Sequence, residues 1–168
     1  MLIQYNNLLI RTAEQKDVPQ LVAWWNDGSV MAHAGFPLGL STTVEKVTAS
    51  LREGLLVIEE NDRLIGECNY RPQEEGVVQI GIKICETACQ NRGVGRKILS
   101  MLITRLFEAG YKKIVLDTNL TNVRAQHVYE SLGFTKLRVN IDSWKDQLGR
   151  PQSSVDYELL EDNFHTFI

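Results

Sequence analysis

Apolar and polar positions alternate along the chain with two periods, which predict strands and helices in a definite order. Short apolar or β-branched runs predict strands, and apolar positions three or four residues apart predict helices with one buried side. The predicted strands cover residues 8–10, 55–59, 64–70, 77–84, 113–118, 134–144 and 153–160, and the predicted helices cover 17–25, 42–51, 93–109 and 122–131. Residues 29–40 are predicted to be irregular, because glycine and proline interrupt them.

The order of these elements predicts the architecture. Helices come first, then an antiparallel meander, then alternating strands and helices, which fits one twisted mixed sheet with helices on both faces. We therefore expect a single domain of the α/β (α+β) class over residues 1–168, with about seven mostly antiparallel strands. The segments Asp17–Gln20 and Thr42–Glu45 predict capping boxes at two helix starts.

The composition excludes several classes of protein. The 168 residues are 43% hydrophobic, which suffices for one buried core, and 18 basic against 21 acidic residues give no electrostatic argument for nucleic-acid binding. No apolar run approaches the roughly 20 residues of a membrane span, and the first residues lack the pattern of a signal peptide. The three cysteines form no CxxC pair and indicate neither a disulfide framework nor a metal site. We expect a cytoplasmic protein that binds no metal, membrane or nucleic acid.

The turn between strand 77–84 and helix 93–109 combines glycines with basic side chains. It reads Gln90-Asn91-Arg92-Gly93-Val94-Gly95-Arg96. Two glycines two residues apart let a bulky group approach the backbone, and the first helical turn offers free N–H groups and the positive end of the dipole. The spacing fits neither a Walker loop nor the dinucleotide fingerprint. The turn therefore predicts a pyrophosphate cradle, the alternative being a tight helix start without a ligand.

A second polar segment follows strand 113–118. Asn122 precedes a predicted helix as its N-cap, and Tyr129 comes seven residues later. This spacing puts the amide and the phenol on one helix face, about 10 Å apart along the axis. The two side chains could therefore contact two parts of one extended cofactor.

These two segments resemble the GNAT superfamily of N-acyltransferases. The string Gln90-x-x-Gly93-x-Gly95 after a strand is similar to the acyl-CoA signature of that superfamily. The string Asn122-x-Arg124-Ala125-x-x-x-Tyr129-x-x-Leu132-Gly133-Phe134 is similar to its second conserved segment. The resemblance extends over most of the chain and implies the same order of strands.

The resemblance implies acetyl-CoA as the co-substrate. Its pyrophosphate would bind backbone N–H groups of residues 90–96, its pantetheine arm would pair with the backbone of the strand before them, and the Asn122 amide would contact the arm. The implied cofactor-binding residues are Ile82, Ile84, Gln90, Asn91, Arg92, Gly93, Val94, Gly95, Arg96 and Asn122.

The resemblance further implies direct transfer of an acetyl group to a primary amine. Tyr129 would face the thioester sulfur and act as the general acid for the departing thiolate. Many family members carry a glutamate base on the strand before the cradle, where this chain has Gln79. Glu67 is the nearest acidic candidate for the base. Glu86 and a water chain are alternatives, and Glu67 could instead be a solvated strand residue.

The acceptor stays open between a small amine, an amino sugar, a polyamine and a protein N-terminus. Residues 26–40 occupy the region that shapes the acceptor pocket in this superfamily. The adjacent Trp24 and Trp25 could form an aromatic wall, and Asp27 could attract a cation. The hairpin 134–160 could close the acceptor side, and its exposed strand could support a homodimer. The alternative function is a non-catalytic CoA-binding sensor or interaction module, which the absence of a glutamate at position 79 favours.

Overall fold

The computed structural model describes all residues from 1 to 168, and its strands form one eight-stranded sheet in the order β1-β2-β3-β4-β5-β6-β8-β7. The strands are β1 (Leu2–Tyr5), β2 (Leu8–Thr12), β3 (Leu55–Glu60), β4 (Arg63–Pro72), β5 (Val77–Ile84), β6 (Lys113–Asn119), β7 (Thr135–Lys145) and β8 (Pro151–Leu160). The α-helices are α1 (Val18–Trp25), α2 (Gly28–Met31), α3 (Val44–Ser50), α4 (Val94–Glu108) and α5 (Val123–Ser131). Short 3₁₀ turns are η1 (Gln15–Asp17), η2 (Ala32–Ala34), η3 (Thr87–Cys89) and η4 (Glu161–Asn163).

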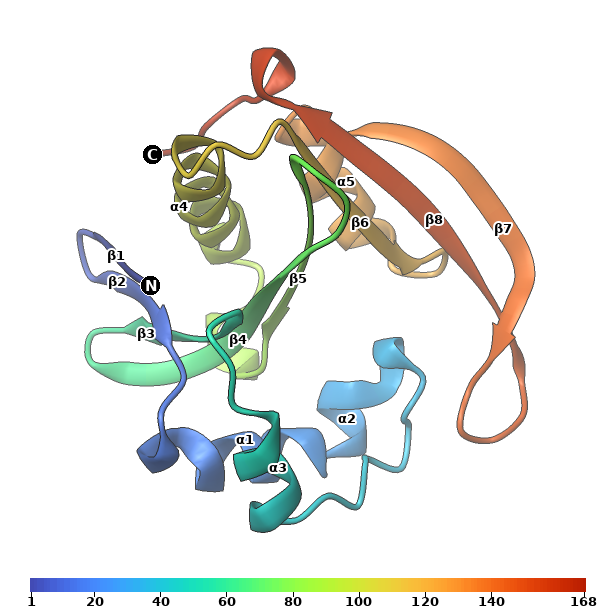
Figure 1. Ribbon diagram of the computed structural model, residues 1–168. Coiled ribbons are helices and arrows are strands. Elements are labelled where there is room, and N and C mark those ends of the chain that lie inside the picture. Colours follow the sequence, from blue (N-terminus) through green and yellow to red (C-terminus); the bar gives the residue numbers. More distant parts are fainter.

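Helices cover both faces of the sheet, as predicted. Helices α4 and α5 lie on one side, and α1, α2 and α3 lie on the other (Figure 1). The apolar stripe of α4 at Ile98, Leu102 and Leu106 is fully buried in the larger core. A smaller core on the opposite face joins Leu21 of α1 to Val57 of β3. None of these helices is both long and apolar enough to cross a membrane.

The prediction of about seven strands omits β1, which pairs antiparallel with β2 at the edge of the sheet. Its residues are half-buried or exposed, so they form no buried apolar run that would mark a strand. The stretch 29–40, predicted to be irregular, contains most of α2 and all of η2. Both are shorter than two helical turns and therefore show no helical period in the sequence.

The two predicted capping boxes differ from the observed helix starts. Asp17 does not cap α1, because its buried carboxylate accepts two hydrogen bonds from the Arg11 guanidinium at 2.7 and 2.8 Å. Arg11 also donates to Glu59 at 2.8 Å. A buried charge needs such partners, so this ion pair replaces the cap. At α3 the cap is Thr43, whose hydroxyl accepts the N–H of Lys46 at 3.3 Å.

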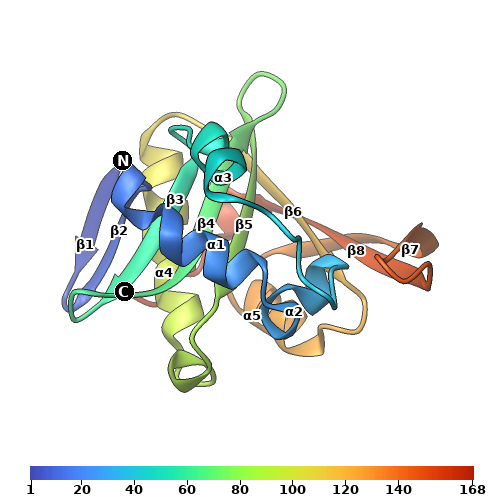
Figure 2. The same ribbon diagram turned by 90° about the horizontal axis from the view of Figure 1, so that it is seen from below.

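Strands β5 and β6 form the one parallel pairing of the sheet, and they soon part. They pair only where Val77–Gln79 faces Lys113–Val115. Figure 2 shows the two strands meeting at one end and diverging toward the other. Beyond Gln79, β5 remains paired with β4 as far as Ile84. The edge of β5 that faces β6 is therefore unpaired over its second half.

The β7–β8 hairpin reaches back to the segment that follows α2. At its tip, the Gln147 side chain donates to the carbonyl of Gly39 and accepts the N–H of Leu38, both at 2.9 Å. The Gln147 N–H also donates to the carbonyl of Gly35 at 2.8 Å. The ring of Trp144 packs so closely on Gly35 that a Cβ there would lie 2.4 Å from it. The hairpin thus closes over the region predicted to shape the acceptor pocket.

Candidate active-site groove

One groove of about 1070 Å³ runs from the start of α4, along the parting of β5 and β6, to α2 and the β7–β8 hairpin. Both candidate catalytic residues, Tyr129 and Glu67, line it. The predicted cofactor-binding residues that line it are Ile82, Ile84, Gln90, Asn91, Gly93, Val94, Gly95, Arg96 and Asn122. Of the predicted set, Arg92 alone does not.

The turn before α4 presents a run of free backbone donors. The N–H groups of residues 91–96 donate to no acceptor within the protein. Asn91 and Gly93 have left-handed backbone angles, with φ of 58° and 75°, and this curl brings consecutive N–H groups toward one concave side. A Cβ at Gly95 would meet no atom within 4 Å, so the helix start is open to a ligand. The turn therefore has the geometry of an anion site.

Gln90 fixes this turn to the sheet instead of offering its own N–H. Its backbone N–H donates to the carbonyl of Thr87 at 3.1 Å, so the predicted run of free donors begins at Asn91. The Gln90 side-chain amide donates to the carbonyl of Ile84 at 2.9 Å. Gln90 thereby joins the end of β5 to the turn and sets the distance between them.

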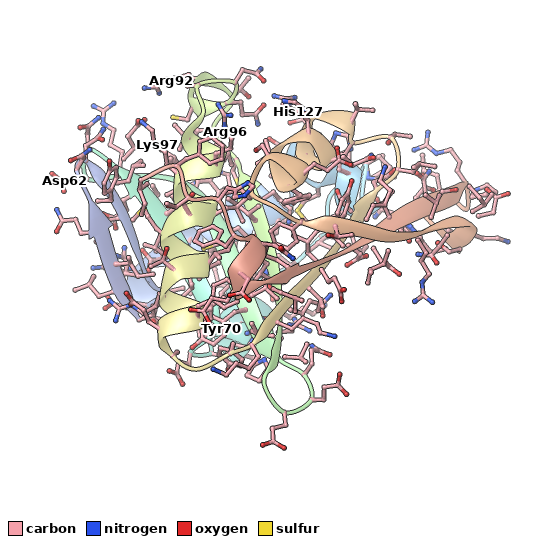
Figure 3. All side chains as sticks on the ribbon, turned by 90° about the horizontal axis from the view of Figure 1, so that it is seen from above. Asp62, Tyr70, Arg92, Arg96, Lys97 and His127 are labelled. Atoms are coloured by element: carbon pink, nitrogen blue, oxygen red, sulfur yellow. The ribbon has the colours of Figure 1, made fainter.

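The positive charge at the turn comes from a different set of arginines than the sequence suggested. The Arg92 guanidinium is turned away and pairs with Glu60 at 3.1 Å. Arg96 lines the groove and lies 4.6 Å from the ring centroid of Phe167. Arg124 of α5 also lines the groove and donates a hydrogen bond to the side chain of Asn91. Figure 3 shows Arg92 and Arg96 at the end of α4 where the helix begins.

The unpaired edge of β5 continues the groove from this turn. The N–H of Cys85 donates to the carbonyl of Ile65 at 2.9 Å, on the β4 side. Because N–H and C=O directions alternate along an antiparallel pair, Ile82 and Ile84 direct their backbone groups away from β4. The Ile84 carbonyl is taken by Gln90, whereas the N–H and C=O of Ile82 are both free. An extended polar chain could pair with this edge as an added strand.

Asn122 and Tyr129 lie along α5, on the other side of the parting. The Asn122 side chain caps α5 by accepting the N–H of Ala125 at 3.2 Å, as predicted, and its amide NH₂ has no partner in the protein. Figure 3 shows His127 on α5, facing outward. His127 nevertheless contributes to the groove lining, at its exposed rim.

Tyr129 is held in an aromatic cluster with its hydroxyl free. Its ring centroid lies 5.8 Å from that of Phe134 and 5.9 Å from that of Tyr157, and only 7% of the residue is exposed. The hydroxyl makes no hydrogen bond within the protein, and since no buried polar side-chain atom lacks a partner, it is open to the groove that Tyr129 lines. Burial raises the pKa of Tyr129 to about 12, and the negative charge of Asp117 adds to the shift. The phenol therefore keeps its proton at neutral pH and can donate it.

Glu67 is buried, which excludes the alternative that it is a solvated strand residue. It is 5% exposed and lies opposite Lys83 in the pairing of β4 and β5. Its carboxylate accepts the Lys83 ammonium at 3.2 Å and the indole N–H of Trp25 at 2.9 Å. The charge of Glu67 is thus offset by a neighbour within the groove.

The other acceptor-side candidates have structural tasks. Trp24 is buried in the smaller core and donates its indole N–H to Glu86 at 2.8 Å. Neither it nor Trp25 lines the groove, so the predicted aromatic wall is absent. Asp27 caps α2 by accepting the Ser29 N–H at 2.8 Å, and does not face the groove.

Asp117, an exposed carboxylate of β6, lines the groove although it was not among the residues predicted for the site. Its one hydrogen bond is a long contact of 3.5 Å from the amide of Gln79. The alternation of side chains along β6 could have identified it, because Ile114 and Leu116 face the core and Asp117 must therefore face away from it. His33, after α2, is a second missed groove residue.

Comparison with known proteins identifies the fold and a family. The family described as "Acetyltransferase (GNAT) domain" matches residues 7–135. N-alpha-acetyltransferase 30 of Dictyostelium discoideum is 27% identical over 81 residues, which are 46% of this chain and 44% of that protein. The chain thus matches less than half the length of that curated relative.

Several solved structures share the fold across nearly the whole chain. A GNAT-family acetyltransferase from Bacillus anthracis has a TM-score of 0.84 at 20% identity, covering 96% of this chain and 99% of its own. Spermidine N-acetyltransferase from Vibrio cholerae, in complex with CoA and spermine, has a TM-score of 0.82 at 19% identity, and the match covers 95% of this chain and 98% of that one. Ribosomal-protein-alanine N-acetyltransferase from Brucella melitensis has a TM-score of 0.76 at 22% identity, and the match covers 90% of this chain and 98% of that one. These likenesses confirm the predicted fold.

Proposed function

Because the chain belongs to the GNAT acetyltransferase family, whose domain matches residues 7–135, we propose that it transfers the acetyl group of acetyl-CoA directly to a primary amine. The observation that carries the proposal is the order of groups along one groove. Free N–H groups come first, then an unpaired strand edge, then the free hydroxyl of Tyr129. This is the order of diphosphate, extended arm and thioester in acetyl-CoA. We assign the activity to residues 1–168 as one domain.

The groove residues bind the donor by complementary charge and backbone pairing. The N–H groups of residues 91–96, at the positive end of α4, would bind the diphosphate, with Arg96 and Arg124 beside it. The free N–H and C=O of Ile82 would pair with amides of the arm, in the manner of an added strand. The free amide of Asn122 would hold the arm from the side of α5.

Three proton and charge movements follow in the transfer. An alkylammonium acceptor, with a pKa near 10.4, must first lose a proton to gain a lone pair. The attacked carbonyl oxygen becomes an oxyanion, which a free N–H on the edge of β5 would stabilise. The departing thiolate, with a pKa near 8.5, would take the proton of Tyr129.

Two carboxylates are candidates for the base. Glu67, the candidate from the sequence, is paired with Lys83 and bonded to Trp25. Asp117 has a single long contact from Gln79, is exposed and lines the same groove as Tyr129. We therefore propose Asp117 as the group that takes the proton of the incoming ammonium, with Glu67 shaping the charge of the pocket.

The charge balance of the acceptor end points to a singly charged amine. Lys83 offsets Glu67, so Asp117 is the one carboxylate of the groove without a basic partner. A polyamine needs several anionic partners to offset its charges, whereas one carboxylate suffices for a monoamine. We propose the N-terminus of a peptide or a small monoamine as a better acceptor than spermidine.

The alternative is a CoA sensor without turnover. Its support is Gln79, which cannot act as a base and is held by Gln73 at 3.3 Å. The free hydroxyl of Tyr129 favours the enzyme, because binding alone has no need of an acid at the sulfur.

The test is a mass-spectrometric turnover assay with acetyl-CoA against pooled amines. The pool contains short peptides with free N-termini, amino acids, polyamines and aminoglycosides. Mass detection is needed because Cys89 is a partly exposed free thiol that a thiol dye would also report. We expect one acetyl group on a monoamine, with less product from Tyr129→Phe. Binding of acetyl-CoA without any acetylated acceptor would support the sensor instead.

A further inference from the structure

Lys83 is a nucleophilic side chain in the groove that takes no chemical step in the transfer to an external amine. No other lysine lines the groove. The Lys83 side chain is 31% exposed, and its ammonium lies 3.2 Å from the carboxylate of Glu67. It projects from β5 on the face opposite the α4 core, because its two neighbours Ile82 and Ile84 pack against that core and side chains alternate along a strand. Lys83 therefore lies on the side from which an acceptor amine would enter.

The position of Lys83 on β5 brings this amine beside the path of the donor. A donor bound at residues 91–96 runs along Ile84 and then Ile82 before its thioester reaches the Tyr129 hydroxyl. Lys83 lies between these two strand residues, and one strand residue advances only about 3.3 Å. The lysine amine and the acetyl group thus occupy the same stretch of the groove.

We propose that Lys83 is an internal acetyl acceptor, so that the protein acetylates its own Nζ when no amine is bound. The inference rests on the proposed function. Glu67, fixed by the indole N–H of Trp25, takes one proton from the ammonium. The nitrogen attacks the carbonyl carbon, the carbon–nitrogen bond forms and the carbon–sulfur bond breaks. Tyr129 gives its proton to the thiolate and recovers one from the nitrogen, so the products are acetyl-lysine, CoA thiol and one proton held by Glu67.

The modification changes the charge of the acceptor end. Acetyl-lysine carries no charge, so Glu67 loses the partner that offsets it and the groove gains one net negative charge. A doubly charged amine would then find two carboxylates instead of one. Self-acetylation thereby shifts the preference of the groove from monoamines toward diamines.

The experiment follows the protein itself, with acetyl-CoA carrying a trideuterated acetyl group and no added amine. Intact mass and peptide mapping measure the label at each lysine over time. We expect close to one label per chain at Lys83, at a rate independent of protein concentration and suppressed by excess CoA. The exposed Lys97 reports uncatalysed acetylation in the same sample. Equal labelling of Lys97 and Lys83 that CoA does not suppress would overturn the inference.

Variants separate the proposed step from simple reactivity. Glu67→Gln should slow the labelling of Lys83 by roughly 10-fold or more, because the proton acceptor is lost. Glu45→Gln, in the exposed first turn of α3, is the matched control and should label like the unmodified chain. Acetyl-CoA binding and transfer to pooled amines are measured in parallel. Transfer to amines without label at Lys83 refutes the internal acceptor alone, whereas absence of acetyl-CoA binding refutes the proposed function as well.

Discussion

At the scale of single residues, the chemistry depends on a phenol that keeps its proton and a carboxylate that can take one. Burial raises the pKa of Tyr129 to about 12, so its proton is present throughout the physiological range. Asp117 is exposed on the neighbouring strand and has no basic partner. In one catalytic cycle, the buried phenol can therefore give a proton to the thiolate while the exposed carboxylate takes one from the ammonium.

Replacement of Tyr129 by phenylalanine tests the acid. The aromatic cluster with Phe134 and Tyr157 is kept, and the hydroxyl, which is open to the groove, has no partner in the protein to lose. We expect kcat to fall by about 10-fold or more, with the Kd of acetyl-CoA nearly unchanged. Steady-state kinetics and calorimetric titration measure the two quantities. Tyr111→Phe, outside the groove, is the control, and an unchanged kcat in Tyr129→Phe would remove this phenol from the mechanism.

Replacement of Asp117 by asparagine tests the base. We expect kcat/KM to fall by about 100-fold at neutral pH and to recover in part as the pH rises toward the pKa of the amine, since the free amine then needs no base. The measurement is kcat/KM of both enzymes at several pH values with one peptide acceptor. Asp62→Asn, in the exposed β3–β4 turn, should leave the profile unchanged. A flat loss at every pH would assign Asp117 a role in binding only.

At the scale of elements, the site depends on two junctions, the turn into α4 and the parting of β5 from β6. Sequence reasoning located the first because Gly93 and Gly95 interrupt an otherwise strongly periodic segment. The resemblance to the GNAT superfamily implied a role for Ile82 and Ile84 in binding the arm, and that role stays a prediction, although both residues line the groove. Sequence reasoning could not foresee that Arg92 pairs with Glu60, because that contact depends on how a distant hairpin packs.

Gly95→Glu tests the turn without disturbing the fold. A Cβ at this position would meet no atom within 4 Å, so the backbone leaves room for a side chain to begin there. The added carboxylate would occupy and repel the anion site, and we expect the affinity for acetyl-CoA to fall by at least about 10-fold. Calorimetric titration measures the affinity. Gly95→Ala should fold with equal or slightly higher stability. If Gly95→Glu bound acetyl-CoA normally, the cofactor assignment would be wrong.

The acceptor side was the least predictable part of the site, because its contacts also join distant elements. Helix α2 has too few residues for a period, and its cap Asp27 looked like a free acid. For Glu67 the sequence left a solvated position open as the alternative to a base, yet Trp25 and Lys83 contact its carboxylate from other elements. Partners that arrive from distant parts of the chain leave no local pattern.

At the scale of the whole molecule, the hairpin and the α2 segment form one wall of the groove through contacts between residues more than a hundred positions apart. We expect Gln147→Ala to loosen this wall, because two hydrogen bonds of its side chain are lost. The KM of the amine should rise by about 3- to 10-fold, a cost of the size of one or two hydrogen bonds, while the Kd of acetyl-CoA stays within twofold. Steady-state kinetics measure the KM of the amine, and Gln4→Ala on β1 is the control variant.

The stability of the whole chain at low pH depends on Asp17. Burial alone would raise its pKa, but the Arg11 guanidinium and the Glu14 N–H outweigh burial and lower the pKa below 3.8. A depressed pKa stabilises the folded state above the unfolded value near 3.9, and this contribution is lost as the pH falls through the folded value. Asp17→Asn should therefore lower the free energy of unfolding by about 3 kcal/mol at neutral pH and by clearly less near pH 3. Urea denaturation at both pH values measures this, and an equal loss at both would contradict it.

The short seam between β5 and β6 has a consequence for how the protein persists in a cell. Since these strands pair only over Val77–Gln79 and Lys113–Val115, the sheet contains an internal edge in its middle. Unpaired edges invite association with other chains, and here the donor molecule itself would cover the edge. A ligand present at a hundred times its dissociation constant stabilises the folded state by about 2.7 kcal/mol through mass action. The abundance of the folded protein would then follow the supply of acetyl-CoA, so that the metabolic state of the cell sets the lifetime of the enzyme as well as its rate.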